Sequence, residues 1–252
     1  MDPTICTQDL TRTYDGTAVV DGVTLTVRRG RVCALLGHNG AGKTTLVRML
    51  STLTRPTSGI ASIAGHDVVT QPDAVRRHTA LVGQAASVDE RLSGRDNLAL
   101  FARLRGRDKA SATARAGELL ERFGLSDAAG RPVRTYSGGM RRKLDLAAAL
   151  VDDPTVLFVD EPSTGLDRRA RRDLWHDLRA LADAGTTILL TTQHLEEADA
   201  LADDVVILRQ GRVVAAGTIG EIRRLAGEPR MELREPSLED VYLTLTATEV
   251  TA

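Results

Sequence analysis

A glycine-rich segment between an apolar strand and a helix constrains the fold more than any other feature of this sequence. Its eight residues fit the pattern G-x-x-x-x-G-K-[ST] at every fixed position: Gly37, His38, Asn39, Gly40, Ala41, Gly42, Lys43 and Thr44. Glycines let the backbone wrap closely around an anion, and successive N–H groups then point inward. The helix that follows directs its positive end at the same anion. The segment therefore predicts a binding site for nucleotide phosphates.

The last residues of this segment add contacts of their own. Lys43 brings a positive charge to the β- and γ-phosphates, and the hydroxyl of Thr44 is a ligand for Mg²⁺. Thr45 follows at the same helix start and is expected to contact the nucleotide. A chance glycine turn is the alternative, but such a turn does not require a preceding strand, a lysine and a threonine in this order.

A second run of residues supplies acidic groups at a strand end. Residues 156–159 are all apolar, and Asp160 and Glu161 follow them directly. Asp160 is placed to hold Mg²⁺, and Glu161 to act as the general base that polarises the attacking water. A strand that simply ends in acidic residues at the surface is the alternative. Downstream of a phosphate loop, the catalytic interpretation is favoured.

Short apolar runs alternate with helix-length segments along the chain, an order that favours a parallel sheet covered on both faces. Strands are predicted at residues 18–20, 23–27, 32–36, 156–159, 188–190 and 205–208. A helix is expected at residues 44–53, and the pattern turns helical from about 86 to 150. The predicted fold class is α/β: a P-loop NTPase core, with a mixed sheet and helices on both faces, plus a helical subdomain and a short C-terminal tail.

Charge and composition exclude several other classes of protein. The 33 basic and 34 acidic side chains leave a net charge of -1, so we expect no nucleic-acid partner. Cys6 and Cys33 form no metal-binding pattern and are expected to be reduced thiols. No apolar run approaches the roughly 18 residues of a membrane span, and the first residues resemble no secretory signal. We therefore expect the chain to act in the cytoplasm or on a membrane surface.

A second helix start also has the residues of an anion site. Ser137, Gly138 and Gly139 open a predicted helix that runs to about Asp153, and no lysine accompanies them. An ordinary N-cap is the alternative. One nucleotide needs only one phosphate loop, so a second site on the same chain suggests that it serves another nucleotide.

These two sites together resemble the ATP-binding cassette (ABC) family over nearly the whole chain. The resemblance implies that the serine–glycine run, the family's signature, closes over ATP held by a second nucleotide-binding subunit. It implies that Gln84 reaches Mg²⁺ and links to the transport domain, and that residues 163–167 line the dimer interface. Tyr14 would stack on adenine; a tyrosine that merely ends a strand is the alternative.

The switch position of this family departs from the usual pattern. The family places a histidine at a strand end, followed by x-Leu-Glu-Glu-Ala, and here the run is Thr191-Thr192-Gln193-His194-Leu195-Glu196-Glu197-Ala198. When Leu195-Glu196-Glu197 is aligned with this pattern, Gln193 occupies the switch position and His194 is the residue after it. Neighbouring residues of an extended chain face opposite ways, so this offset of one residue matters. We expect Gln193 to contact the γ-phosphate, and both residues remain catalytic candidates.

Within the family, residues 87–94, 136–147 and 236–243 resemble the daunorubicin/doxorubicin-resistance type of exporter ATPase. This implies an ATP-binding and hydrolysing subunit that couples ATP-driven dimerisation, as a homodimer, to efflux of a drug-like or antibiotic small molecule. Its partner would be a separate integral membrane permease of a type-2 ABC exporter, with the chain peripheral on the cytoplasmic side of the cell membrane.

The resemblance also divides the chain. The nucleotide-binding domain is expected at residues 1–219, with a helical signature subdomain at about 86–150, and the C-terminal tail at 220–252. The segment 221–235 is short for this subgroup. A cassette ATPase in DNA repair or on the ribosome is the alternative function, but the former needs long heptad arms and the latter two cassettes.

Overall fold

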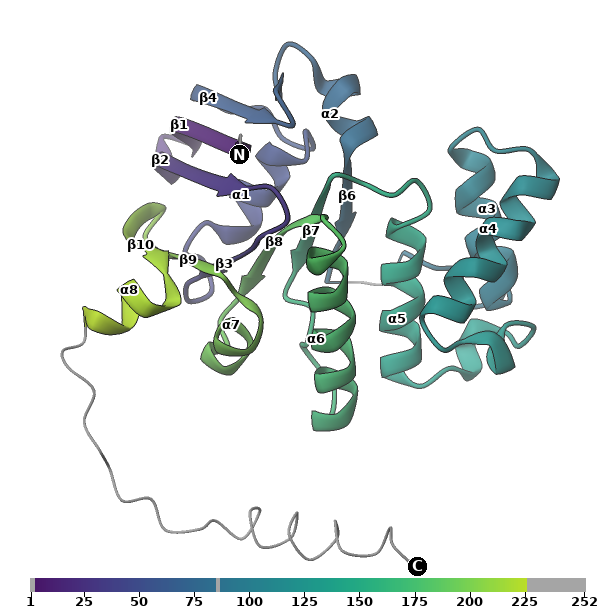
Figure 1. Cartoon of the computed structure of the whole chain (residues 1–252). Coiled ribbons are helices and arrows are strands. Elements are labelled where there is room, and N and C mark those ends of the chain that lie inside the picture. The colour runs from purple at the N-terminus through teal and green to yellow at the C-terminus, as the bar shows by residue number, and fades with distance from the viewer. Residues whose placement is uncertain (1–2, 85–86, 226–252) are drawn as a thin grey trace, which may run out of the picture. The chain divides into compact units, whose positions relative to one another are not determined.

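The computed structural model describes residues 3–84 and 87–225 (Figure 1). The chain divides into two compact units, residues 1–222 and 223–252, and the tail motif at 236–243 lies outside the described residues.

The strands are β1 Pro3–Tyr14, β2 Thr17–Arg28, β3 Val32–Leu36, β4 Ser58–Ile63, β5 His66–Asp67, β6 Thr79–Val82, β7 Val156–Asp160, β8 Thr187–Thr192, β9 Asp204–Arg209 and β10 Arg212–Thr218. The helices are α1 Lys43–Leu50, α2 Pro72–His78, α3 Gly94–Leu104, α4 Lys109–Arg122, the 3-10 turns η1 Ser126–Ala128 and η2 Val133–Thr135, α5 Gly138–Ala149, α6 Arg168–Asp183, α7 Leu195–Leu201 and α8 Ile219–Arg224.

A six-stranded mixed sheet forms the centre of the first unit. Its strand order is β10-β9-β3-β8-β7-β6, and every neighbouring pair is parallel except the β10–β9 pair at one edge. Register pairs Leu36 of β3 with Thr192 of β8, and Asp160 of β7 with Thr191 of β8. The carboxyl ends of three strands therefore meet at one edge of the sheet, where α/β proteins bind their ligands.

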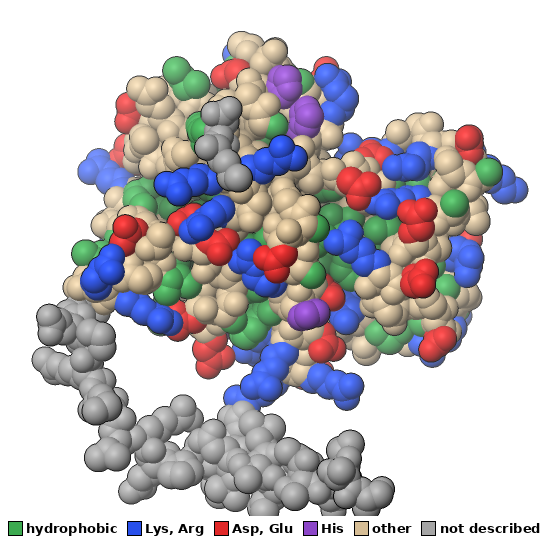
Figure 2. Space-filling model, viewed as in Figure 1, with side chains coloured by type: hydrophobic (Ala, Val, Ile, Leu, Met, Phe, Trp, Pro, Cys, Tyr) green, Lys and Arg blue, Asp and Glu red, His purple; other side chains and the backbone are tan. Residues whose placement is uncertain are grey.

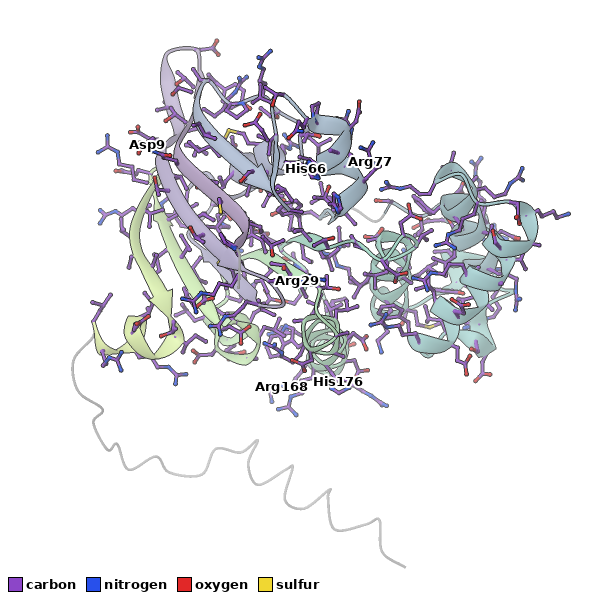
Figure 3. All side chains as sticks on the ribbon, turned by 45° about the horizontal axis from the view of Figure 1, so that its top comes forward. Asp9, Arg29, His66, Arg77, Arg168 and His176 are labelled. Atoms are coloured by element: carbon purple, nitrogen blue, oxygen red, sulfur yellow. The ribbon has the colours of Figure 1, made fainter. Side chains whose placement is uncertain are left out.

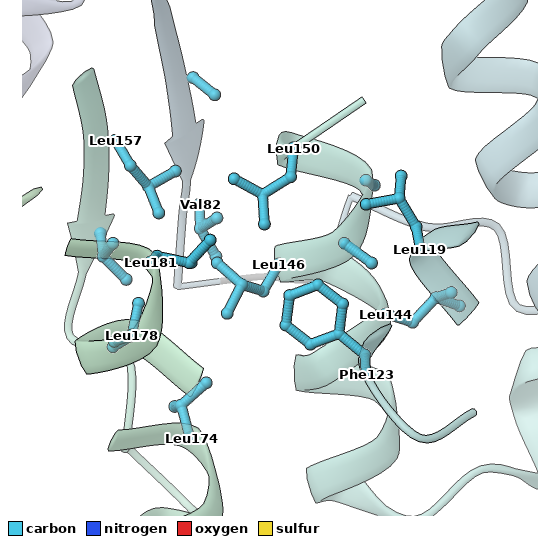
Figure 4. Close-up of a cluster of buried hydrophobic side chains, with 14 of the residues drawn as sticks. Val82, Leu119, Phe123, Leu144, Leu146, Leu150, Leu157, Leu174, Leu178 and Leu181 are labelled. Atoms are coloured by element: carbon cyan, nitrogen blue, oxygen red, sulfur yellow. The ribbon is translucent and has the colours of Figure 1, made fainter. Parts of the chain in front are cut away.

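Alternate residues of these strands enter two separate cores. On one face, Val159 and Leu190 pack with apolar residues of α3, α4, α5, α6 and α7. Figure 4 shows part of this core, in which Leu146 of α5 and Leu150, just after that helix, lie on the side of α6 and β7, whereas Leu144 lies on the side of Leu119 of α4. On the other face, strand residues pack against α1 and a second sheet. The expected α/β core with helices on both faces is confirmed.

The second sheet is antiparallel, with strand order β2-β1-β4-β5. The runs at residues 18–20 and 23–27, predicted as separate strands, belong to the single strand β2, which continues through Gly22 at φ 62°. Strand β1 escaped the sequence analysis because its buried positions do not alternate cleanly. Register shifts between Thr7 and Leu10, and again up to Arg12, interrupt the two-residue period.

Two predicted helices end earlier than expected. The helix expected to reach Leu53 ends at Leu50, because Thr52 adopts φ 63° and the N–H groups of Leu53 and Thr54 return to the carbonyl of Arg48. The signature helix ends at Ala149 rather than near Asp153, and single turns close the segment that follows it.

Charged side chains of both signs share the visible face of the first unit in Figure 2. The basic run Arg168–Arg172 begins α6 behind the N-cap Asp167. Arg168 and Arg169 are exposed, and Figure 3 shows Arg168 and His176 pointing outward from α6.

Candidate functional site

The phosphate loop connects β3 to α1 and needs glycine at its last turn. Gly42 is the N-cap of α1 with φ 102°, and no side chain caps this helix start. A Cβ on Gly42 would lie 2.5 Å from the carbonyl oxygen of Val19, so a larger residue would push the loop away from β2. The N–H groups of the first turn therefore remain available to an anion.

Lys43 is held inside this loop by its own backbone. Its side chain is 5% exposed, and Nζ donates to the carbonyl oxygens of Gly37 at 2.7 Å and His38 at 3.1 Å. Burying an ammonium is costly unless such partners surround it. Lys43 therefore places a fixed positive charge beside the N-terminus of α1, and a negatively charged phosphate group fits this position.

The hydroxyl of Thr44 reaches across to the end of β7. Its Oγ1 donates to the carboxylate of Asp160, 3.1 Å from Oδ2, and Thr191 of β8 donates to Oδ1 of the same carboxylate. Within the described part of the chain, no group of three or more His, Cys, Asp or Glu side chains could hold a metal ion. A hydroxyl beside a carboxylate still fits Mg²⁺, which binds proteins through few ligands and takes others from phosphates.

Glu161 occupies a strained position beside the loop. Its φ is 47°, in the left-handed region that non-glycine residues rarely adopt, and its N–H donates to the carbonyl and hydroxyl oxygens of Thr191, each at 3.1 Å. Its Oε1 lies 3.8 Å from Lys43 Nζ. The fold thus holds a carboxylate next to the phosphate-binding charge.

One cavity of about 250 Å³ collects most of the predicted nucleotide residues. Its lining comprises Val19, Asn39, Gly40, Ala41, Gly42, Lys43, Thr44, Thr45, Gln84 and Glu161. Gln84 follows β6, so a fourth strand end contributes to the site. The sequence analysis missed Val19, whose only signal is its place on the strand that packs against the loop. Tyr14 is not in this lining; it lies 39% exposed, with the Arg12 guanidinium 4.4 Å from its ring centre.

The signature residues face other cavities. Ser137 is the N-cap of α5, where its Oγ accepts from the N–H of Met140 at 3.3 Å. Ser137 and Gly139 line a cavity of about 300 Å³ together with Asp167, whereas Gly138 lines another with Gln84 and Glu161. Within one chain, the structure does not bring Ser137 and the phosphate loop into the same cavity.

The switch residues follow β8 at the same sheet edge. Gln193 and His194 both have exposed side chains. His194 is the N-cap of α7, and its carbonyl accepts from the N–H groups of Glu197 and Ala198. His194 thus has a structural role through its backbone, and the choice between the two side chains stays a prediction.

A glycine-rich loop after a parallel strand, with an acidic strand end beside it, defines a P-loop nucleoside triphosphatase. The family model for ABC transporters matches residues 20–164. The chain is 53% identical over 228 residues to the daunorubicin/doxorubicin resistance ATP-binding protein DrrA of Streptomyces peucetius, covering 90% of this chain and 69% of that protein. It is 48% identical to the doxorubicin resistance ATP-binding protein DrrA of Mycobacterium tuberculosis over 248 residues, covering 98% and 75%.

A solved structure agrees with these relatives. The structure of an ATP-binding subunit of an ABC transporter superposes with a TM-score of 0.78 at 34% identity, covering 96% of this chain and 99% of the other. The chain belongs to the ABC transporter family, in which it is an ATP-binding and ATP-hydrolysing subunit.

Proposed function

We propose that two copies of this chain bind two ATP molecules between them, head to tail, and that dimerisation and hydrolysis drive an exporter. The observation that carries this proposal is the separation of the two half-sites. Lys43 and Glu161 of one chain share a cavity, whereas Ser137 and Gly139 line a different one. A second copy would supply Ser137 and Gly139, which a single chain holds in a different cavity from its phosphate loop.

Within each site the residues divide the chemistry. Lys43 and the loop amides bind the phosphates, and Glu161 accepts a proton from the attacking water. Thr44, Asp160 and Gln84 would hold Mg²⁺, which when bound shields the phosphate charge and orients the oxygens for in-line attack.

Two further contacts complete the proposed nucleotide site. Gln193, at the end of β8, contacts the γ-phosphate, while His194 caps α7. Tyr14 stacks on adenine at the outer end of β1. Neither residue lines the cavity of about 250 Å³ in the single chain, and the proposal is that the nucleotide and the second chain extend the site to them.

The cargo is a small drug-like or antibiotic molecule, exported through a separate type-2 permease. The similarity to daunorubicin and doxorubicin resistance proteins supports this class of cargo. No helix among residues 3–84 and 87–225 has the length and apolar character to cross a membrane. A permease partner would supply the spans and hold this chain at the cytoplasmic side of the membrane.

The test uses Glu161→Gln, which keeps the size of the side chain and removes the base. We expect it to bind ATP, to lose about 10²- to 10³-fold in kcat, and to accumulate as a dimer on size exclusion with ATP. Glu121→Gln, an exposed change on α4, is the matched control and should behave like the wild type. An unchanged kcat in Glu161→Gln, or a protein that stays monomeric with ATP, would contradict the proposal.

A further inference from the structure

The signature helix α5 carries a buried positive charge next to the nucleotide motifs. Arg142 lies in the first turns of α5, with its side chain 10% exposed. Its Nη1 donates to the carbonyl of Gly83 at 2.6 Å, its Nε to that of Pro162 at 3.0 Å, and its Nη2 to that of Asp160 at 3.4 Å. One guanidinium therefore joins the loop after β6 to the loop after β7.

Each of these carbonyls belongs to, or adjoins, a residue of the proposed site. Gly83 precedes Gln84, and Pro162 follows Glu161. Because a guanidinium is planar and its N–H groups have fixed directions, it fixes the spacing of the carbonyls that it binds. We propose that Arg142 is a positioning residue for ATP hydrolysis, holding Gln84 and Glu161 at their working separation.

Asp145, one turn further along α5, adds to the contacts of Arg142, and we call these two side chains the clamp. Its Oδ1 accepts from the N–H of Ser87 at 2.8 Å, and its Oδ2 lies 3.6 Å from Arg142 Nη1. Gly83 and Ser87 lie on either side of Gln84 in the chain. Helix α5 thus holds the polypeptide both before and after Gln84, so movement of the signature helix moves Gln84 with it.

The charged forms of Arg142 and Asp145 stabilise each other inside the protein. Burial lowers the pKa of Arg142, and the carboxylates of Asp145, Glu197 and Asp160 act in the opposite direction. Burial raises the pKa of Asp145. Removing the guanidinium outright would leave Asp145 as an unpaired buried carboxylate and would destabilise the fold. A variant that keeps the positive charge therefore separates positioning from stability.

The inference rests on the proposed ATPase function, and its first test is Arg142→Lys. One ammonium retains the charge but cannot reach carbonyls of both loops. We expect kcat to fall about 10- to 100-fold while KM for ATP changes less than about threefold, because the phosphate loop is untouched. Arg115→Lys is the matched control. Arg115 also donates to two backbone carbonyls, those of Leu150 and Val151, at the far end of α5, and its variant should keep its kcat.

A double-mutant cycle distinguishes positioning from a general loss of structure. If Arg142 acts through Gln84, the loss in kcat for Arg142→Lys combined with Gln84→Ala is smaller than the product of the two single losses. A loss equal to that product would overturn the inference, as would wild-type kcat in Arg142→Lys.

Hydrogen–deuterium exchange tests the clamp without relying on turnover. The Ser87 amide and peptides covering 157–163 should lose protection in Arg142→Lys and keep it in Arg115→Lys. If the wild-type protein hydrolyses no ATP, the proposed function fails, and this exchange experiment still decides the clamp. Unchanged protection in both segments would overturn it.

Discussion

The sequence predicts an anion site at the N-terminus of α1 and another at that of α5, yet the two helix starts differ. At α1 the N-cap is Gly42, no side chain satisfies the first N–H groups, and the buried ammonium of Lys43 lies beside them. At α5 the side chain of Ser137 already accepts one N–H group. The first helix start is open to an anion and charged, whereas the second is partly satisfied by its own cap.

The difference indicates that the two sites have unequal shares in binding ATP. The α1 site has a charge, open amides and the carboxylate of Glu161, the proposed base, within one cavity. Ser137, Gly138 and Gly139 carry no charge of their own, so we expect the α5 site to add contacts to an ATP already bound at a phosphate loop. We therefore expect losses at α1 to remove binding and losses at α5 to remove turnover.

The largest effect should follow from Lys43→Ala. Losing the buried ammonium removes a charge-assisted contact to phosphate, and we expect kcat/KM to fall about 10³-fold, mostly through weaker ATP binding. Titration of ATP by calorimetry measures the binding. Lys109→Ala, at the exposed start of α4, is the control with unchanged affinity. Normal ATP affinity in Lys43→Ala would place the phosphates elsewhere.

The switch residues give the next effect. Gln193→Ala should lower kcat about 10²-fold, because it removes one polar contact to the γ-phosphate that strengthens during hydrolysis. His194→Ala should keep its kcat, since the cap of α7 uses the His194 backbone, which alanine retains. Steady-state ATPase assays compare the two variants. If the order of the two losses is reversed, His194 is the switch.

At α5, Ser137→Ala separates capping from catalysis. The lost cap should cost about 1 kcal/mol of unfolding free energy, and kcat should fall about tenfold while the Kd of the isolated chain for ATP stays within about twofold. Ser93→Ala is the matched control, because the Oγ of Ser93 caps α3 in the same way. The two variants should have similar melting temperatures. Equal ATPase rates in Ser137→Ala and Ser93→Ala would show that Ser137 only caps its helix and has no role in turnover.

The smallest effect concerns the strand beneath the phosphate loop. Burial raises the pKa of the Cys33 thiol to about 12, and burial also raises the pKa of the less buried Cys6. Raising the pH to about 9 should speed the reaction of Cys6 with a thiol reagent, while Cys33 stays protonated and inaccessible to the reagent. Thiol counting should find one reactive group in the folded protein and two in denaturant. Two groups in the folded protein would show that β3 opens.

The sequence could place most lining residues of one cavity together because its pattern is local. Gly42, Lys43 and Thr44 are contiguous, and Asp160 ends a strand whose other residues are all apolar, with Glu161 next in the chain. Parallel strands bring such ends together, so the fold class and the cavity could be predicted from the same residues. The site roles themselves remain proposals that the variants above test.

The parts that the sequence did not predict depend on distant contacts. In the sequence, nothing distinguishes Arg142 from an ordinary exposed arginine. Only the fold shows that it donates to backbone carbonyls 18 to 59 residues away in the chain. Strand β1 was missed for a related reason: register shifts, which its neighbours set, break its apparent period.

The central claim is that one chain's phosphate loop works with another chain's signature, and mixing two impaired variants tests it most directly. Lys43→Ala and Ser137→Ala are purified, mixed in equal amounts and assayed for ATP hydrolysis. Half of the dimers would be mixed, each with one intact composite site, so the account predicts a rate of about a quarter of the wild type, well above either variant alone. A mixture no faster than the average of the two variants would contradict it.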